Sequence, residues 1–121
     1  MKAVVLGTGG WGTAISQILC DNGHETYLWS HNPAKAAEMA RTRENPLLKG
    51  VILQDALHIT GDLDCLKGAD LVVSAPPSFA VRETAGKMAP YLTEKTVVVS
   101  VSKGIERDTN LRLSQVIGEE I

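Results

Sequence analysis

The first twelve residues contain the feature that most constrains the fold of this chain. Residues 2–6, with sequence KAVVL, form a short apolar run, and residues 7–12, with sequence GTGGWG, follow it directly. After them, apolar residues recur on one helical face up to about residue 22. The string therefore matches G-x-G-x-x-G at the junction of a predicted strand and a predicted helix, which is typical of a dinucleotide-binding turn.

Each glycine of this motif has an expected role. Gly7 permits the tight turn, Gly9 permits the close approach of a diphosphate, and Gly12 permits close packing of the helix on the strand. The diphosphate would lie on free backbone N–H groups at the positive end of the helix. The alternative is a glycine-rich turn between strand and helix that binds nothing.

Apolar runs and amphipathic segments alternate along the rest of the chain. Strands separated by helices predict a parallel sheet covered on both faces and wound through right-handed crossovers. The expected fold is one doubly wound, Rossmann-like α/β domain over residues 1–121. The patterns predict strands at residues 2–6, 25–30, 57–60, 71–75 and 96–101, and helices at residues 10–22, 33–43 and 62–68, after a cap at Ser78, and from about Thr109.

Composition excludes several classes of function. The formal net charge of −2 argues against a nucleic-acid binder that neutralises phosphates. No apolar run approaches the length that crosses a membrane. Cys20 and Cys65 lack a disulfide pattern and predict free thiols in a reducing, cytoplasmic compartment. The histidines and cysteines have no metal-ligand spacing, so we expect no metal site.

The residues after the second predicted strand bear on the choice of dinucleotide. An acid at this position would hold the ribose 2′-OH of NAD, whereas a basic residue would accept the 2′-phosphate of NADP. The chain has Ser30, His31 and Asn32 here, without a carboxylate. His31 and Asn32 can donate hydrogen bonds to a phosphate, which favours NADP over NAD. The alternative is that His31 is an exposed loop residue without a role.

Two further loops are expected at the same edge of the sheet. Pro76, Pro77 and Ser78 follow the strand next to the first one, so the prolines would form a rigid wall for a nicotinamide ring. The alternative is that they only start a helix. Lys103 follows the fifth strand and would offer a positive charge to a phosphorylated substrate or cofactor. The alternative is that Lys103 is only a solvated loop lysine. No residues in the chain form a nucleophile–histidine–carboxylate set, so we expect no catalysis by this chain alone.

Several separated patches resemble one family, the bacterial NAD(P)-dependent glycerol-3-phosphate dehydrogenases. The resemblance covers essentially the whole chain. The sequence WGTA at residues 11–14 is more specific than the glycines before it. The other patches are Asn22-Gly23-His24, Leu28-Trp29, Arg43-Glu44-Asn45, Ala75 with Pro77-Ser78, and Ser102-Lys103-Gly104-Ile105-Glu106.

The resemblance implies reversible hydride transfer between NAD(P)H and dihydroxyacetone phosphate, which gives sn-glycerol 3-phosphate for phospholipid synthesis. It implies cofactor contacts at Gly10, Trp11, His31 and Asn32, and contact of Lys103 with both cofactor and substrate. It also implies that the catalytic lysine belongs to a later helical domain. The last helical pattern is still running at the end of the sequence, so we expect a longer protein, for which a homodimer stays open.

The sequence departs from the family pattern in three places. The family commonly has arginine at or beside His31, and it has Tyr-Leu-Pro within the segment that here reads PLLKG at residues 46–50. Pro76 replaces an aliphatic residue. Two alternatives stay open: the first domain of another two-domain dehydrogenase, for ketopantoate or hydroxyacyl thioesters, and a nucleotide-sensing module that catalyses nothing.

Overall fold

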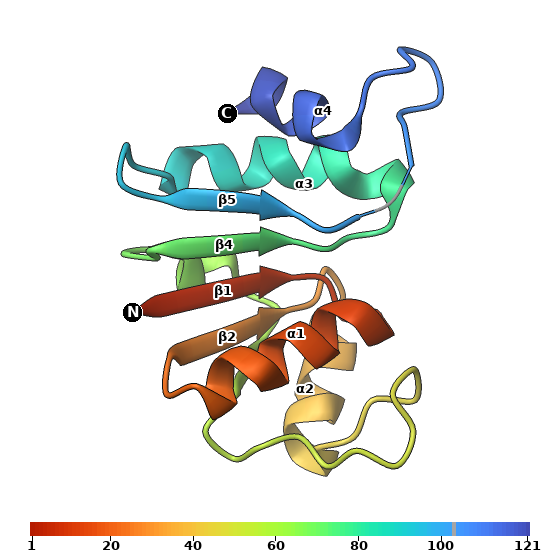
Figure 1. Ribbon diagram of the computed structural model, residues 1–121. Coiled ribbons are helices and arrows are strands. Elements are labelled where there is room, and N and C mark those ends of the chain that lie inside the picture. The colour runs from red at the N-terminus through yellow and green to blue at the C-terminus, as the bar shows by residue number, and fades with distance from the viewer. Residues whose placement is uncertain (103) are drawn as a thin grey trace.

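The computed structural model describes residues 1–102 and 104–121 and has a parallel β-sheet at its centre (Figure 1). Its strand order is β3-β2-β1-β4-β5, and all the strand pairs are parallel. This order confirms the predicted doubly wound sheet. The strands are β1 (Lys2–Leu6), β2 (Glu25–Trp29), β3 (His58–Thr60), β4 (Leu71–Ser74) and β5 (Val97–Ser100).

Helices cover both faces of the sheet, because alternate residues of each strand point to opposite sides. Val4 and Leu6 of β1 pack in a core with α3 and α4, whereas Val5 packs in a second core with α1 and α2. Figure 1 shows α1 and α2 on one side of the sheet and α3 and α4 on the other. The α-helices are α1 (Gly10–Asp21), α2 (Pro33–Thr42), α3 (Val81–Met88) and α4 (Leu113–Glu120), and 3-10 turns span Leu63–Leu66, Ser78–Ala80 and Ala89–Tyr91.

Two predicted helix starts are wrong. Ser78 does not cap α3, because Ala80 N–H donates to Pro77 O at 2.9 Å and closes a 3-10 turn before the helix begins. The last helix begins at Leu113 rather than near Thr109, because Asn110 takes a positive φ of 56° that interrupts a helix.

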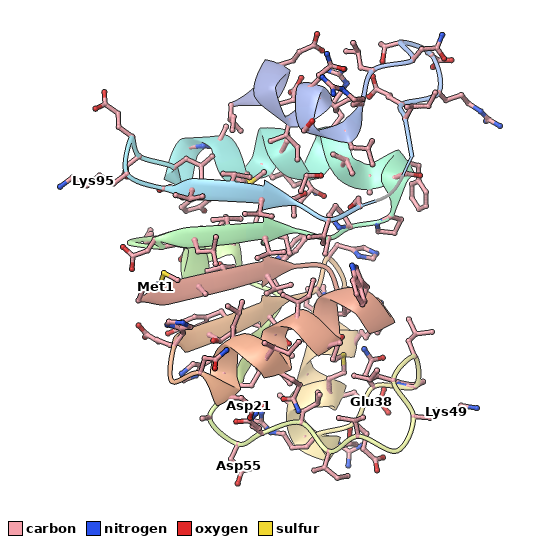
Figure 2. The ribbon with its side chains drawn as sticks, viewed as in Figure 1. Met1, Asp21, Glu38, Lys49, Asp55 and Lys95 are labelled. Carbon is pink, nitrogen blue, oxygen red and sulfur yellow. The ribbon has the colours of Figure 1, made fainter. Side chains whose placement is uncertain are left out.

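The carboxyl ends of all five strands meet at one edge of the sheet (Figure 1). We call this edge the carboxyl edge. The chain order reverses between β1 and β4, and such a reversal is where open α/β sheets bind ligands. Figure 2 shows Met1 and Lys95 at the opposite edge. Within the described residues, no helix is long and apolar enough to cross a membrane.

Candidate functional site

The turn between β1 and α1 is closed so tightly that only glycine fits at two positions. Gly7 has a φ of +126°, and a Cβ there would collide with the carbonyl oxygen of Ala75 at the end of β4. A Cβ on Gly12 would lie 2.5 Å from the Gly7 carbonyl oxygen and 3.2 Å from the Ala75 Cβ. The contacts give Gly7 and Gly12 the turn and packing roles that the motif predicts.

Gly9 differs from these glycines because it faces open space. A Cβ on Gly9 would meet nothing within 4 Å, and its backbone is extended with φ −64° and ψ 170°. Thr13 N–H donates the first bond of α1, to Gly9 O at 3.0 Å. The N–H groups of Gly10, Trp11 and Gly12 precede that bond, so they are the unpaired first-turn donors that a helix presents to an anion.

A cavity of about 420 Å³ lies beside the glycine turn. The exposed indole of Trp11 lines it, together with residues from the loops after β4 and β5. Ser102 Oγ donates to Pro76 O at 2.5 Å and ties these two loops together. Among the described residues, those that line it carry no ionisable side chain; they are Trp11, Ala75, Pro76, Val101 and Ser102.

One residue predicted from the sequence, Pro77, is not among the described residues that line this cavity. Pro76 is buried and lines it, whereas Pro77 is exposed and precedes the 3-10 turn at Ser78–Ala80. Lys103 lies outside the described residues.

At the end of β2, Asn32 caps α2 as the sequence predicts. Its Oδ1 accepts hydrogen bonds from Ala34 N–H at 3.0 Å and Lys35 N–H at 3.3 Å. Its own N–H donates to the buried Ser30 hydroxyl at 3.2 Å. The Asn32 side-chain oxygen is therefore committed to the helix, and its amide NH₂ group is what it can offer a ligand.

His31 is exposed and lines a second cavity at the carboxyl edge. Asp62, from the loop after β3, lines the same cavity, and its Oδ1 accepts a hydrogen bond from Asp64 N–H at 2.9 Å. Lys87 of α3 also lines this cavity, with its ammonium 3.2 Å from a Glu83 carboxylate oxygen. The sequence around the end of β2 does not reveal the Asp62 carboxylate, because it follows a different strand, about 30 residues later.

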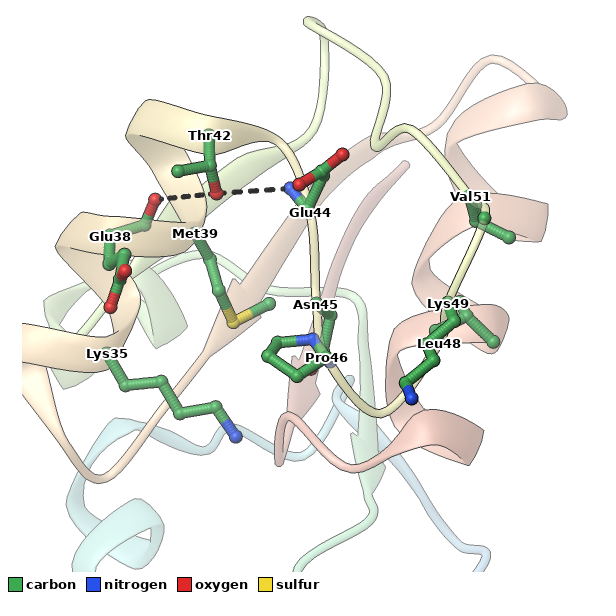
Figure 3. A pocket seen from close by; sticks show the side chains of 11 residues that line it. Lys35, Glu38, Met39, Thr42, Glu44, Asn45, Pro46, Leu48, Lys49 and Val51 are labelled. Atoms are coloured by element: carbon green, nitrogen blue, oxygen red, sulfur yellow. Dashed lines mark hydrogen bonds between the residues drawn. The ribbon is translucent and has the colours of Figure 1, made fainter.

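A third cavity of about 490 Å³ lies between α2 and residues 44–51, which we call the α2–β3 segment (Figure 3). Lys35 extends into this cavity from α2, and Lys49 borders it from the segment, with Glu38 and Glu44 on other sides. Thr42 Oγ1 donates to Glu38 O at 3.0 Å and accepts from Glu44 N–H at 3.3 Å, which fixes where the segment leaves the helix. The ion pairs found among the described residues include neither lysine.

The sequence marks Asn45 only as part of a family patch and predicts no role for it, but this residue is only 2% exposed. Its Nδ2 donates to Thr8 O and to Thr13 Oγ1, both at 2.8 Å, so it joins the α2–β3 segment to the glycine turn. Leu47 O lies only 2.9 Å from where a Cβ on Gly10 would be. No local pattern could reveal bonds that span 37 and 32 residues.

A charge cluster holds the loop after β5. The Arg82 guanidinium of α3 donates two hydrogen bonds of 2.7 Å to Glu106, and it also pairs with Glu119 and Glu120 of α4. The guanidinium lowers the pKa of the Glu106 carboxyl from 4.5 to about 2. This bidentate pair fixes the loop from α3, close to the carboxyl edge.

The two cysteines are packing residues. Both are buried, and burial raises the pKa of the Cys65 thiol from 9.0 to about 11. Burial also raises the pKa of the Cys20 thiol. In residues 1–102 and 104–121, no group of three or more His, Cys, Asp or Glu side chains is placed to hold a metal ion.

The chain is similar to known dehydrogenases over almost its full length. The sequence model of the family "NAD-dependent glycerol-3-phosphate dehydrogenase N-terminus" matches residues 2–121. Glycerol-3-phosphate dehydrogenase [NAD(P)+] of Bacillus velezensis is 42% identical over 122 residues, and that of Moorella thermoacetica is 46% identical over 118 residues. These alignments cover 99% and 96% of this chain.

The fold agrees with a solved structure of the same enzyme class. The crystal structure of glycerol-3-phosphate dehydrogenase from Coxiella burnetii superposes with a TM-score of 0.90 at 28% identity, over 98% of this chain and 37% of that one. The chain spans about 35% of the length of the two curated relatives.

Proposed function

Because the chain belongs to the family of NAD-dependent glycerol-3-phosphate dehydrogenase N-terminal domains, we propose that it binds NAD(H) or NADP(H) at the carboxyl edge of its sheet. The glycine turn is the observation that carries this proposal. Gly7 and Gly12 are closed against neighbouring backbone, whereas Gly9 faces open space beside the first-turn N–H groups of α1. A diphosphate on these donors would gain hydrogen bonds and the favourable helix dipole.

The two cavities beside the turn suit the two halves of the cofactor. The apolar cavity at Trp11 and Pro76 would hold the flat nicotinamide ring, with Pro77 at its outer side and Lys103 expected near the substrate phosphate. The cavity at His31 and Asn32 would hold the adenosine ribose, since it lies at the end of β2. Together with Gly7, Gly9, Gly10 and Gly12, these are the residues that we propose for cofactor binding.

We propose that the full-length protein reduces dihydroxyacetone phosphate reversibly to sn-glycerol 3-phosphate for phospholipid synthesis. The nicotinamide supplies or accepts the hydride, and a general acid must protonate the carbonyl oxygen. None of the described residues that line the cavity at Trp11 is ionisable. The proton donor is therefore proposed to come from the part of the relatives' length that this chain does not span. A cytoplasmic location and a homodimer are further proposals for the full-length protein.

Cofactor choice depends on the charges around His31. No carboxylate follows β2 directly, and His31 and the Asn32 amide can donate hydrogen bonds to a phosphate. Asp62 is the opposing charge, and it comes from the loop after β3 rather than from the end of β2. We expect NADPH to bind more tightly than NADH.

The first experiment titrates the chain with NADPH and then NADH while Trp fluorescence is followed, because exposed Trp11 lies beside the proposed nicotinamide site. In a His31→Asp variant, the new carboxylate would repel the 2′-phosphate, so the NADPH preference should fall at least tenfold. Asn32 is left unchanged because its loss would uncap α2. His24→Asp, which makes the same change near the start of β2, should bind both cofactors like the wild type.

Three outcomes would oppose the proposal. Equal affinity for both cofactors in the wild type would make His31 a bystander. Absence of binding would contradict a preformed cofactor site in this chain. Failure of the full-length protein to reduce dihydroxyacetone phosphate with either cofactor would favour a nucleotide-sensing module.

A further inference from the structure

The buried side chain of Asn45 forms hydrogen bonds to the glycine turn both before and after Gly9. Nδ2 donates to Thr8 O at 2.8 Å, just before Gly9, and to Thr13 Oγ1 at 2.8 Å, just after the first turn of α1. Oδ1 accepts from Leu47 N–H at 3.1 Å. The partners determine the amide orientation, because Thr8 O only accepts and Leu47 N–H only donates.

The bond to Thr8 controls the direction of a peptide group in the proposed binding turn. The Thr8–Gly9 peptide is trans and planar, so its carbonyl and its N–H point in opposite directions. Holding the Thr8 oxygen toward buried Asn45 therefore turns the Gly9 N–H away from the core. A Cβ on Gly9 would meet nothing within 4 Å, so the turn is also open beside this peptide.

We infer that Asn45 is a positioning residue for cofactor binding, which keeps the Thr8 carbonyl away from the ligand side of the glycine turn. The identity of the ligand rests on the proposed function, whereas the hydrogen bonds from Asn45 to the turn do not depend on it. If the peptide flipped, the partial negative charge of the Thr8 oxygen would face the diphosphate and oppose its binding. The second bond, to Thr13, fixes the helix start on which the first-turn donors depend.

A purely structural role for Asn45 would act differently, by holding the α2–β3 segment on α1. The chain offers a matched control for that role in Gln54, which follows the segment. Gln54 N–H donates to Gln17 Oε1 at 3.1 Å, and its side chain donates to Gln17 O at 3.3 Å and to Asp21 Oδ1. Gln54→Ala therefore loosens the attachment to α1 without touching the glycine turn.

The test compares Asn45→Asp with Gln54→Ala and with wild type. Asn45→Asp has nearly the same shape and keeps the acceptor for Leu47 N–H but loses both donors. We expect its NADPH dissociation constant to rise at least tenfold at pH 7 and the amide NMR resonances of Gly9, Gly10 and Trp11 to shift. Gln54→Ala should stay within twofold of wild type in NADPH affinity and leave those resonances in place.

Two further measurements separate positioning from folding. The carboxyl group that Asn45→Asp introduces can donate to an oxygen again once it is protonated. The NADP⁺ dissociation constant of this variant, divided by that of wild type at the same pH, should therefore fall as the pH falls from 7 to 5. Should Asn45→Asp fail to fold, Thr13→Val replaces it. That variant loses one of the two bonds and should bind NADPH two- to fivefold more weakly with the same amide resonances displaced.

The inference is overturned if folded Asn45→Asp binds NADPH as wild type does. It is also overturned if Gln54→Ala loses as much NADPH affinity as Asn45→Asp does. The same holds if the amide resonances of the glycine turn move in neither Asn45→Asp nor Thr13→Val. Absence of NADPH binding by wild type would contradict the proposed function. The amide resonances of the unliganded chain would still decide the role of Asn45.

Discussion

At the scale of single residues, neighbouring glycines of the same motif are required for different reasons. Gly7 and Gly12 are required because backbone atoms fill the space that a Cβ would occupy. Gly9 has no such neighbour, so its lack of a side chain contributes nothing to packing. The need for glycine at position 9 is therefore expected to lie in ligand binding alone.

Alanine at these glycines should separate folding from binding. Gly12→Ala places a Cβ 2.5 Å from the Gly7 oxygen, so it should lower the free energy of unfolding by about 1–3 kcal/mol despite better helix propensity. Gly9→Ala should leave stability within about 0.5 kcal/mol, as ordinary surface changes do, and weaken NADPH binding at least tenfold. Urea unfolding and fluorescence titration measure both. Equal NADPH affinity in folded Gly9→Ala would show that the open face is not the diphosphate site.

Burial of the thiols predicts low reactivity. With its pKa raised to about 11, Cys65 is almost entirely protonated at pH 8, and the thiolate is the reactive form. Native protein should therefore react with a thiol reagent such as DTNB far more slowly than urea-unfolded protein, by at least a hundredfold. Fast labelling of one thiol in the native protein would contradict this burial.

The sequence predicted the residues of the site that act through local structure. Gly7 and Gly12 follow from a turn motif, and the Asn32 cap follows from the proline after it. The roles of Asn45 and Asp62 were not predicted because each residue reaches the site from another part of the chain. Their roles depend on which strands become neighbours, and a single sequence does not state side-chain contacts at that range.

At the scale of elements, one arginine joins two helices and a loop. Arg82 in the first turn of α3 pairs with Glu106 and with Glu119 and Glu120 of α4. The predicted start of α4 was wrong in this same region, where Thr109 Oγ1 donates to Glu106 at 2.6 Å and Asn110 turns the chain. The pattern of Leu113, Val116 and Ile117 identified the helix correctly, because all three are buried in the core with α3. Its start depends on hydrogen bonds that periodicity does not reveal.

Replacement of Arg82 by Gln should make stability less dependent on acid pH. The folded pKa of Glu106, about 2, lies below its ordinary 4.5, so the ionised carboxylate stabilises the fold fully above about pH 4.5. This contribution is lost as the pH falls from about 4.5 toward 2. Wild type should therefore unfold at higher urea than Arg82→Gln at pH 7, and the difference should shrink steadily between pH 4.5 and 2.5. A difference that stays constant over this range would contradict the proposed pairing.

At the scale of the whole molecule, the candidate site is assembled from both halves of the sheet. β1 lies at the centre, with β2 on one side and β4 on the other, and the glycine turn touches the end of β4 through Ala75. The alternation of strands and helices was enough to predict this architecture. The cavity at Trp11 could not be outlined from sequence, since Ser102 and Pro76 close it through a bond between two loops.

We expect residues 1–121 alone to bind the cofactor without turnover. NADPH at 100 times its dissociation constant should raise the free energy of unfolding by about 2.7 kcal/mol. No oxidation of NADPH should follow when dihydroxyacetone phosphate is added, because none of the described residues lining the cavity at Trp11 can donate a proton to the substrate. Thermal unfolding and absorbance at the reduced-nicotinamide band test the two parts. Sustained turnover by the purified chain would contradict the assignment of the proton donor elsewhere.

The central position of β1 also has a consequence for the order of events during synthesis. β1 leaves the ribosome well before one of its two partners, β4 (Leu71–Ser74), which follows roughly 70 residues later. The glycine turn cannot pack against Ala75 before that residue has left the ribosome. The apolar residues of the N-terminal segment therefore stay exposed until then. Nascent chains stalled before β4 should therefore be sensitive to protease and depend on chaperones. In longer nascent chains, the strands on both sides of β1 should become protected from protease at the same chain length.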